Sequence, residues 1–327
     1  MGVKVEIPSL YLCKFIMAMM VIMIHSSFLF PKTFYSFALT FCRVAVPMFL
    51  MISGFFSDSL FVKREVILWK ILKICLISSL FWAAYYLIVN GGGYVANRIN
   101  WTSFFDFLLL NTPFFGNHLW YLYAIFLVYL FFPIVKLLFN AKSVVLVGNW
   151  TININYLLIV SFILFYCSIL YGISRSWLFT AIPFFLLGRY LYDNKDFFII
   201  RVSNKFLWGM FVLCSGLLLF ECKYSPFPKS DLYLFNLPLS VSLFLLFIKN
   251  PNWGINSVWA KIGNKDTLYI YIFHIVFVSL VKTIFVKSLS QDYLQYMFVV
   301  TIPLVVVMNV LFSRFLLFVE SLLKKKK

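Results

Sequence analysis

The chain has 327 residues, of which 63% are hydrophobic and only 12% are charged. Soluble domains are about half apolar and about a quarter charged, so this composition excludes an ordinary water-soluble enzyme and indicates an integral membrane protein. The net charge of +17 does not indicate nucleic-acid binding, because the Lys and Arg residues fall mainly in short segments between apolar runs.

The apolar runs predict an all-α, polytopic membrane protein with about ten transmembrane helices, each near the length that crosses about 30 Å of hydrocarbon. We expect one membrane domain over residues 1–327. The predicted spans are residues 9–30, 39–57, 66–89, 118–139, 155–173, 176–192, 206–221, 231–248, 266–286 and 293–319.

Positive charge predicts the orientation of these spans. With the N-terminus in the cytoplasm, most of the 28 Lys and Arg residues lie on the cytoplasmic side, including the C-terminal Lys324, Lys325, Lys326 and Lys327. The sequence therefore predicts an N-in, C-in topology. The one long connection, Asn90 to Asn117, is then outside, where its aromatic residues could form a lid at the membrane interface.

The first span contains His25, about 16 residues from its start, which places the imidazole roughly 24 Å from the cytoplasmic end and in the outer half of the membrane. Ionisable groups inside a span are expensive and are functional candidates by default. A neutral imidazole can accept the proton of a hydroxyl that attacks a carbonyl. His25 is therefore the candidate general base.

Further candidates follow along the chain. Arg43 is at the outer end of the second span and His118 opens the fourth from the outside, at the same depth as His25, whereas His274 is nearer the middle of the ninth. The alternative for each histidine is a hydrogen bond between helices. On the inner side, Lys70 and Lys73 share one helix face and could bind phosphate, or they are ordinary positive-inside anchors.

Four segments of the chain resemble the acyltransferase-3 membrane family. They are KFIMAMMVIMIHSS, with ten residues between Lys14 and His25; CRVAVPMFLMISGFF, with Arg43; HLWYLYAIFLVYLFFPIV, with His118 and Trp120; and IGNKDTLYIYIFHIVFV, with His274. Their order covers essentially the whole chain. The resemblance is greatest to the branch that contains the enterobacterial common antigen O-acetyltransferase.

The resemblance implies that the chain is an O-acyltransferase and a multi-pass protein of the bacterial inner membrane. Acetyl-CoA or another acyl-CoA would be the co-substrate from the cytoplasm, the acceptor would be an envelope glycan or lipid-linked sugar, and no metal or nucleic acid would take part. In this interpretation Lys14, Lys70 and Lys73 bind the CoA, His25 deprotonates the acceptor, and Arg43 and His118 orient the sugar or stabilise the oxyanion. Trp120 and His274 would contact the substrate.

The chain also departs from the family pattern. Lys14 replaces an arginine, Tyr11 replaces a common aspartate, and a pair of arginines is replaced by Lys70 and Lys73. Lysine keeps the charge but loses the bidentate fork that fits phosphate. Ser53, next to Gly54, is expected to serve helix packing rather than covalent catalysis. The main alternative function is a transporter or exporter of glycan precursors, although the sequence shows no internal repeat.

Overall fold

The structure is a computed structural model that describes residues 7–26, 32–111, 113–131, 134, 142–147, 150–172, 175–224, 232–288 and 298–325. Its internal contacts group the chain into two units. Unit 1 comprises Met1–Ala45, Asn204–Tyr224 and Pro238–Lys327, and unit 2 comprises Val46–Ser203 and Ser225–Leu237. Each unit therefore brings together segments that are far apart in the sequence.

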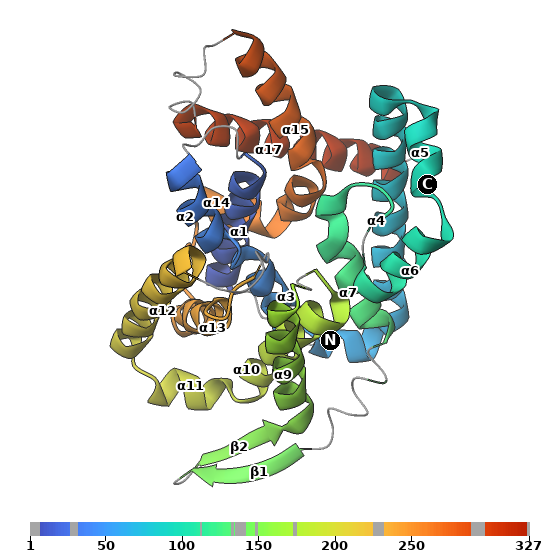
Figure 1. Cartoon of the computed structure of the whole chain (residues 1–327). Coiled ribbons are helices and arrows are strands. Elements are labelled where there is room, and N and C mark those ends of the chain that lie inside the picture. Colours follow the sequence, from blue (N-terminus) through green and yellow to red (C-terminus); the bar gives the residue numbers. More distant parts are fainter. Residues whose placement is uncertain are drawn as a thin grey trace. The chain divides into compact units, whose positions relative to one another are not determined.

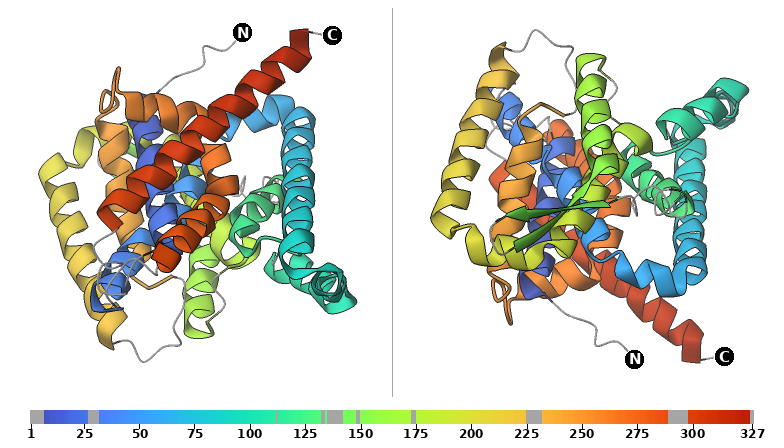
Figure 2. Two further views of the ribbon diagram at one scale, coloured as in Figure 1. Left: turned by 90° about the horizontal axis from the view of Figure 1, so that it is seen from above. Right: turned by 90° about the horizontal axis from the view of Figure 1, so that it is seen from below.

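Unit 1 is built from helices, several of which pack against α1 (Figure 1). These helices are α1 (Pro8–His25), α2 (Lys32–Cys42), α12 (Asn204–Tyr224), α13 (Asn236–Lys249, in this unit from Pro238), α14 (Val258–Lys265), α15 (Thr267–Ser288) and α17 (Phe298–Lys325). The long helix α17, red in Figure 2, crosses α15 and also contacts α1.

The apolar pattern of α1 explains its central place in unit 1. Its buried residues Leu10, Cys13, Met17 and Val21 recur every three or four positions, which places them on one helical face. At the start of α1, the Ser9 hydroxyl donates a hydrogen bond of 2.6 Å to the carbonyl of Phe247 in α13. This bond ties the first helix to a segment more than 200 residues later in the chain.

Unit 2 contains the longest helix of the described chain, α4. Its elements are α3 (Ala45–Phe55, in this unit from Val46), α4 (Asp58–Asn90), α5 (Gly92–Arg98), α6 (Trp101–Leu110), η2 (Asn117–Leu119), α7 (Trp120–Leu130), β1 (Lys142–Val147), β2 (Trp150–Asn155), α9 (Tyr156–Leu170), η3 (Trp177–Ala181), α10 (Ile182–Asp193) and α11 (Lys195–Arg201). The strands β1 and β2 pair antiparallel, from Lys142 opposite Asn155 to Val147 opposite Trp150.

Two glycines allow α3 and α10 to cross at backbone contact. A Cβ atom added to Gly54 would lie 1.9 Å from the carbonyl oxygen of Phe185, and one added to Gly188 would lie 2.0 Å from that of Met51. Small residues at such crossings are typical of helix packing in membranes. The hydroxyl of Ser53 donates to the Phe49 carbonyl at 2.9 Å, within its own helix. Both observations favour the packing interpretation of this segment.

The helix α4 is long enough to extend beyond the hydrocarbon core at both ends, since 33 residues span about 50 Å. Much of its apolar surface is exposed, with Ile77, Leu80 and Ile88 each more than 60% accessible. Such a surface is stable against lipid and unfavourable in water. Gly91, at φ 82°, ends the helix and turns the chain into α5.

The described parts of the predicted spans are largely helical, and six described helical segments are long and apolar enough to cross a membrane. These are Pro8–His25, Phe37–Phe55, Glu65–Asn90, Asn204–Tyr224, Thr267–Ile284 and Val300–Leu322. Three apolar helices are shorter, namely Asn117–Leu130, Tyr156–Leu170 and Asn236–Lys249. A multi-pass helical membrane protein is thus confirmed, while the count of about ten spans and the N-in, C-in topology stay predictions.

Two features differ from the sequence expectation. The β1–β2 hairpin is an exception to the all-α class, in a stretch that was predicted as a connection between two spans. The connection from Asn90 to Asn117 is largely helical, because it contains α5 and α6. Asn100 caps α6 by accepting a hydrogen bond from the amide of Ser103 at 2.8 Å. The single domain over residues 1–327 stays a prediction.

Candidate functional site

In unit 1, the structure brings two of the three histidines into contact. His25 is in the last turn of α1 and His274 is in α15, and their ring centroids are 5.0 Å apart with the planes tilted by 50°. His274 is completely buried, whereas His25 is partly exposed. The packing of α15 on α1 therefore forms an imidazole pair with one accessible member.

The hydrogen bonds of His274 indicate its tautomer. Its Nδ1 atom is 3.1 Å from the carbonyl oxygen of Ile270 and 2.8 Å from that of Tyr271. A carbonyl oxygen only accepts, so Nδ1 carries a proton, and in the neutral ring the lone pair is then on Nε2. His274 is thus held in a fixed orientation beside His25.

Arg43 lies in the turn between α2 and α3. The preceding residue, Cys42, contacts Met23 of α1, with 4.0 Å between the two sulfur atoms. Met23 is in the same last turn of α1 as His25. The break between the helices therefore brings the backbone at Arg43 to the end of α1 that carries His25.

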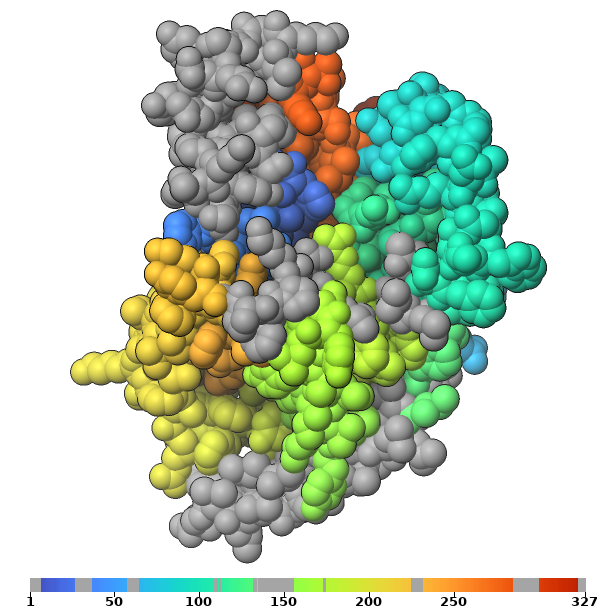
Figure 3. Space-filling view, viewed as in Figure 1, coloured from blue at the N-terminus to red at the C-terminus, as the bar shows by residue number. Residues whose placement is uncertain are grey.

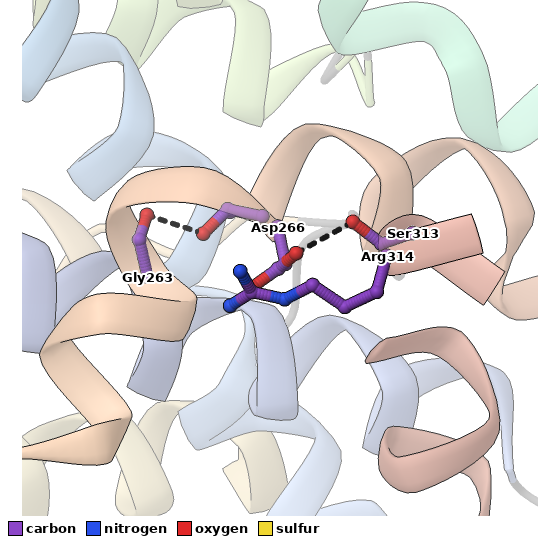
Figure 4. Close-up of polar contacts among 5 residues, drawn as sticks. Gly263, Asp266, Ser313 and Arg314 are labelled. Atoms are coloured by element: carbon purple, nitrogen blue, oxygen red, sulfur yellow. Dashed lines mark hydrogen bonds and ion pairs between the residues drawn. The ribbon is translucent and has the colours of Figure 1, made fainter. Parts of the chain in front are cut away.

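A buried carboxylate fixes the start of α15 (Figure 4). Asp266 accepts a hydrogen bond of 2.6 Å from the Ser313 hydroxyl and forms an ion pair of 2.7 Å with Arg314, both from α17. Its carbonyl oxygen accepts from the amide of Ile270, in the first turn of α15. Asp266 thus ties α17 to the helix that carries His274, about 12 Å further along the axis.

Replacing Arg314 by leucine is expected to lower the free energy of unfolding by about 2 kcal/mol. Breaking a buried ion pair typically costs about 3–5 kcal/mol, and we expect less because the Arg314 side chain is 44% exposed. Denaturant unfolding in detergent micelles measures the loss. Lys265→Leu, which removes an exposed charge from the neighbouring helix end, is the matched control; equal stabilities of the two variants would contradict a structural ion pair.

In unit 2, the third histidine packs against a buried tryptophan. His118, in η2, is 8% exposed and forms an edge-to-face contact with Trp82 of α4, at 4.6 Å between centroids. Gly116 has φ 70°, and a Cβ atom added there would lie 3.1 Å from Trp82 and 3.2 Å from His118. Glycine therefore suits the turn that places this imidazole on the indole, because a side chain at this φ would be strained and would crowd both rings.

The remaining predicted residues are distributed over both units. Trp120 begins α7 and its carbonyl accepts a hydrogen bond of 3.0 Å from Asn111. Lys70 and Lys73 are exposed on α4, within the segment that could cross a membrane. Lys14 is on α1, with its ammonium 5.6 Å from the ring centre of Tyr11, and ten residues of helix lie between it and His25, which is about 16 Å away along the axis.

The structure thus groups the predicted residues in two sets. His25 and His274 are in contact in unit 1, with Arg43 at the same end of α1, while Lys14 is far along that helix. His118 and Trp120 belong to unit 2 together with Lys70 and Lys73. A joint action of His25 and His118 stays a prediction.

Sequence reasoning missed Trp82 and the ion pair of Asp266 with Arg314. A signal for the pair was present, because Arg314 is a charged residue inside the predicted span 293–319 and such residues normally have a partner. Trp82 had no comparable signal, since the chain contains nine tryptophans and indoles are common in membrane helices.

Comparison with known proteins gave one match. A family described as an acyltransferase domain, acyltransferase-3, matches residues 7–317 of the chain. No curated protein and no solved structure matches it. The matched range contains all three histidines and every other candidate residue named above.

Proposed function

Because the chain belongs to the acyltransferase-3 family, whose members are membrane acyltransferases, we propose that it is an O-acetyltransferase of a surface glycan. The donor is acetyl-CoA from the cytoplasm, with succinyl-CoA as the alternative. The acceptor is a hydroxyl of an envelope polysaccharide or lipid-linked sugar on the outer side of the bacterial inner membrane. The resemblance to the branch of the enterobacterial common antigen O-acetyltransferase supports this choice of acceptor class.

The observation that carries the proposal is the contact between His25 and His274. Transfer to a hydroxyl needs a base that is both accessible and oriented. His25 is partly exposed, and the buried His274 beside it is held by two backbone carbonyls. The pair therefore provides an accessible base and a fixed group that positions it.

The proposed reaction uses this arrangement. The acceptor hydroxyl transfers its proton to His25 as its oxygen attacks the thioester carbonyl carbon. A C–O bond forms, the C–S bond breaks, and the CoA sulfur leaves with the proton returned by the imidazolium. Arg43, near the same end of α1, stabilises the negative charge on the carbonyl oxygen. His118 and Trp120 orient the sugar.

On the donor side, we propose that Lys14, Lys70 and Lys73 bind the phosphates of CoA. Lys70 and Lys73 are one helical turn apart and both are exposed. Tyr86, near the other end of α4, is about 24 Å away from Lys70 along the axis. This separation is comparable to the thickness of the membrane core, and it supports the proposal of a donor side at the Lys70 end of α4.

The double variant Lys70→Gln, Lys73→Gln is expected to raise the KM for acetyl-CoA about 10-fold and to leave kcat within about twofold, because the loss of charge weakens binding of the CoA phosphates but not the chemical step. Initial rates of CoA release at varied acetyl-CoA concentration measure both constants.

The matched control is Lys205→Gln with Lys223→Gln, which removes two exposed lysines of α12 that are not part of the proposed donor site. If this control raises the KM as much, general surface charge rather than a phosphate site is responsible. An unchanged KM in the double variant would remove Lys70 and Lys73 from the donor site.

The alternative function is transport of glycan precursors. The predicted number of spans fits a transporter as well as an acyltransferase. The two functions differ in chemistry, because a transporter breaks no thioester bond. Release of free CoA from acetyl-CoA by the purified chain in the presence of envelope glycan therefore separates them. No release above the rate without protein would favour transport.

A further inference from the structure

A cluster of aromatic and polar side chains lies where α4 meets α5. It comprises Tyr85 and Tyr86 of α4, Tyr94 and Arg98 of α5, and Asn117 of η2, and we call it the α4–α5 aromatic site. All of these residues belong to unit 2. None of them was selected from the sequence.

The rings of this site form a continuous series. Trp82 contacts Tyr85 at 5.1 Å and Tyr86 at 5.9 Å between centroids. Tyr86 in turn contacts Tyr94 at 5.4 Å, with the planes tilted by 39°. Since Trp82 also contacts His118, the series runs from the buried histidine to the surface of α5.

Polar groups end the series at the surface. The guanidinium of Arg98 donates to the hydroxyl of Tyr94 at 2.8 Å and to Oδ1 of Asn117 at 3.5 Å. It also lies 5.2 Å from the ring centre of Tyr94. Asn117 is exposed, and Tyr86, Tyr94 and Arg98 are partly exposed. The surface of α5 is part of the teal region of Figure 3, which also includes neighbouring parts of α4 and α6.

This combination has the chemistry of a carbohydrate site. The C–H face of a sugar ring packs on aromatic rings, and its hydroxyls accept or donate hydrogen bonds at the ring edges. Tyrosine rings supply apolar area with a polar tip, and arginine and asparagine supply several donors in fixed positions. Ligand sites typically join a few placed polar groups to aromatic walls.

The simpler alternative is a belt of interfacial aromatic anchors. Anchors of that kind direct their rings to the lipid headgroups. Here the ring of Tyr86 packs on the rings of both Tyr94 and Trp82, and Arg98 is held by two side chains. Two side-chain partners restrict the guanidinium in a way that a lipid anchor does not require.

We propose that the α4–α5 aromatic site binds a hexose ring of the acceptor glycan. This inference rests on the proposed O-acetyltransferase function, and it identifies the acceptor class as a sugar held by its C–H face on tyrosine rings. Tyr86 and Tyr94 contact that face, and Arg98 and Asn117 bind its hydroxyls. The contact of Trp82 with both His118 and Tyr86 links this subsite to the histidine predicted to orient the sugar.

Saturation-transfer NMR on the detergent-solubilised full chain tests the site. The probes are the methyl glycosides of glucose, galactose, mannose and N-acetylglucosamine, each without acetyl-CoA. Saturation of the aromatic protons is expected to pass to the ring C–H protons of at least one sugar. Tyr86→Ala and Arg98→Gln are expected to reduce that signal at least 5-fold, and Tyr94→Phe, which removes only the hydroxyl that holds Arg98, is expected to reduce it about twofold.

Tyr171→Ala, which removes a tyrosine that is 79% exposed at the end of α9, is the matched control and should keep the signal. Equal signals in Tyr86→Ala, Arg98→Gln and the control, or no transfer to any of the four sugars, would overturn the proposal. Displacement by anionic lipid micelles but not by sugars would assign the site to a lipid headgroup and would also overturn it. Because no acetyl-CoA is present, a failure of the proposed catalysis does not change these readings.

Discussion

His25→Gln is expected to reduce O-acetyl transfer about 1000-fold, within the range in which a general base contributes to catalysis. Glutamine has a similar size and can still form hydrogen bonds, but its amide does not accept a proton near neutral pH. The contact with His274 should be preserved sterically, because the two rings are 5.0 Å apart and the α1–α15 packing does not depend on charge. Initial rates of transfer to envelope glycan, measured by NMR of the O-acetyl groups, give the effect.

The unfolding temperature of His25→Gln in detergent is the control for this prediction, and it should match that of the wild type within a few degrees. His274→Gln provides a second comparison, since its Nδ1 position is held by the carbonyls of Ile270 and Tyr271. A positioning residue of this kind should lower kcat less than the base itself. Transfer by a folded His25→Gln at more than a tenth of the wild-type rate would remove His25 from the mechanism.

Gly188→Ala is expected to lower the free energy of unfolding by about 3 kcal/mol, at the upper end of the usual cost of overpacking. The added Cβ would lie 2.0 Å from the Met51 carbonyl oxygen and 2.7 Å from its carbon, so α3 and α10 would have to separate. Because Gly54 makes the reciprocal contact with Phe185, no compensating space exists at this crossing. Denaturant unfolding and the yield of monodisperse protein in detergent measure the effect.

Gly216→Ala in α12 is the matched control, because a Cβ atom there meets nothing within 4 Å. Replacing a helical glycine by alanine without a clash normally stabilises the helix by about 0.5–1 kcal/mol. The two substitutions should therefore have opposite signs. Similar effects of both would mean that the close crossing of α3 and α10 does not occur in the folded protein.

The positions of the membrane helices could be predicted from the sequence because long apolar segments have few stable structures in lipid. In hydrocarbon a helix satisfies its own backbone, so the apolar residues from 66 to 89 predict a helix, and α4 (Asp58–Asn90) covers them. The helices α5 and α6 were not predicted, because an interfacial helix lacks the length and uniform hydropathy of a span. The β1–β2 hairpin was missed although β2 carries a strand signal, since its sequence WTININ alternates strictly between apolar and polar residues. The stretch was interpreted only as a connection between two spans.

The candidate site could be predicted residue by residue but not as an arrangement. The motifs select His25 and His274 separately, and their contact depends on how α15 packs on α1, which no local pattern specifies. The partnership of Asp266 with Arg314 likewise joins residues 48 positions apart. Trp82 acquires its relation to His118 through the turn at Gly116. Such contacts are products of tertiary packing, whereas sequence periodicity reports only local structure.

Transfer of the acetyl group across a membrane tests the role of His25 as the general base. Wild-type chain and His25→Gln are reconstituted in liposomes, with radiolabelled acetyl-CoA on one side only and deacetylated envelope glycan on the other. The account predicts that label enters the glycan through the wild-type chain, with release of free CoA on the donor side, and that both signals fall to background with His25→Gln. Equal labelling by the two chains, or labelled acetyl-CoA crossing intact without release of CoA, would contradict it.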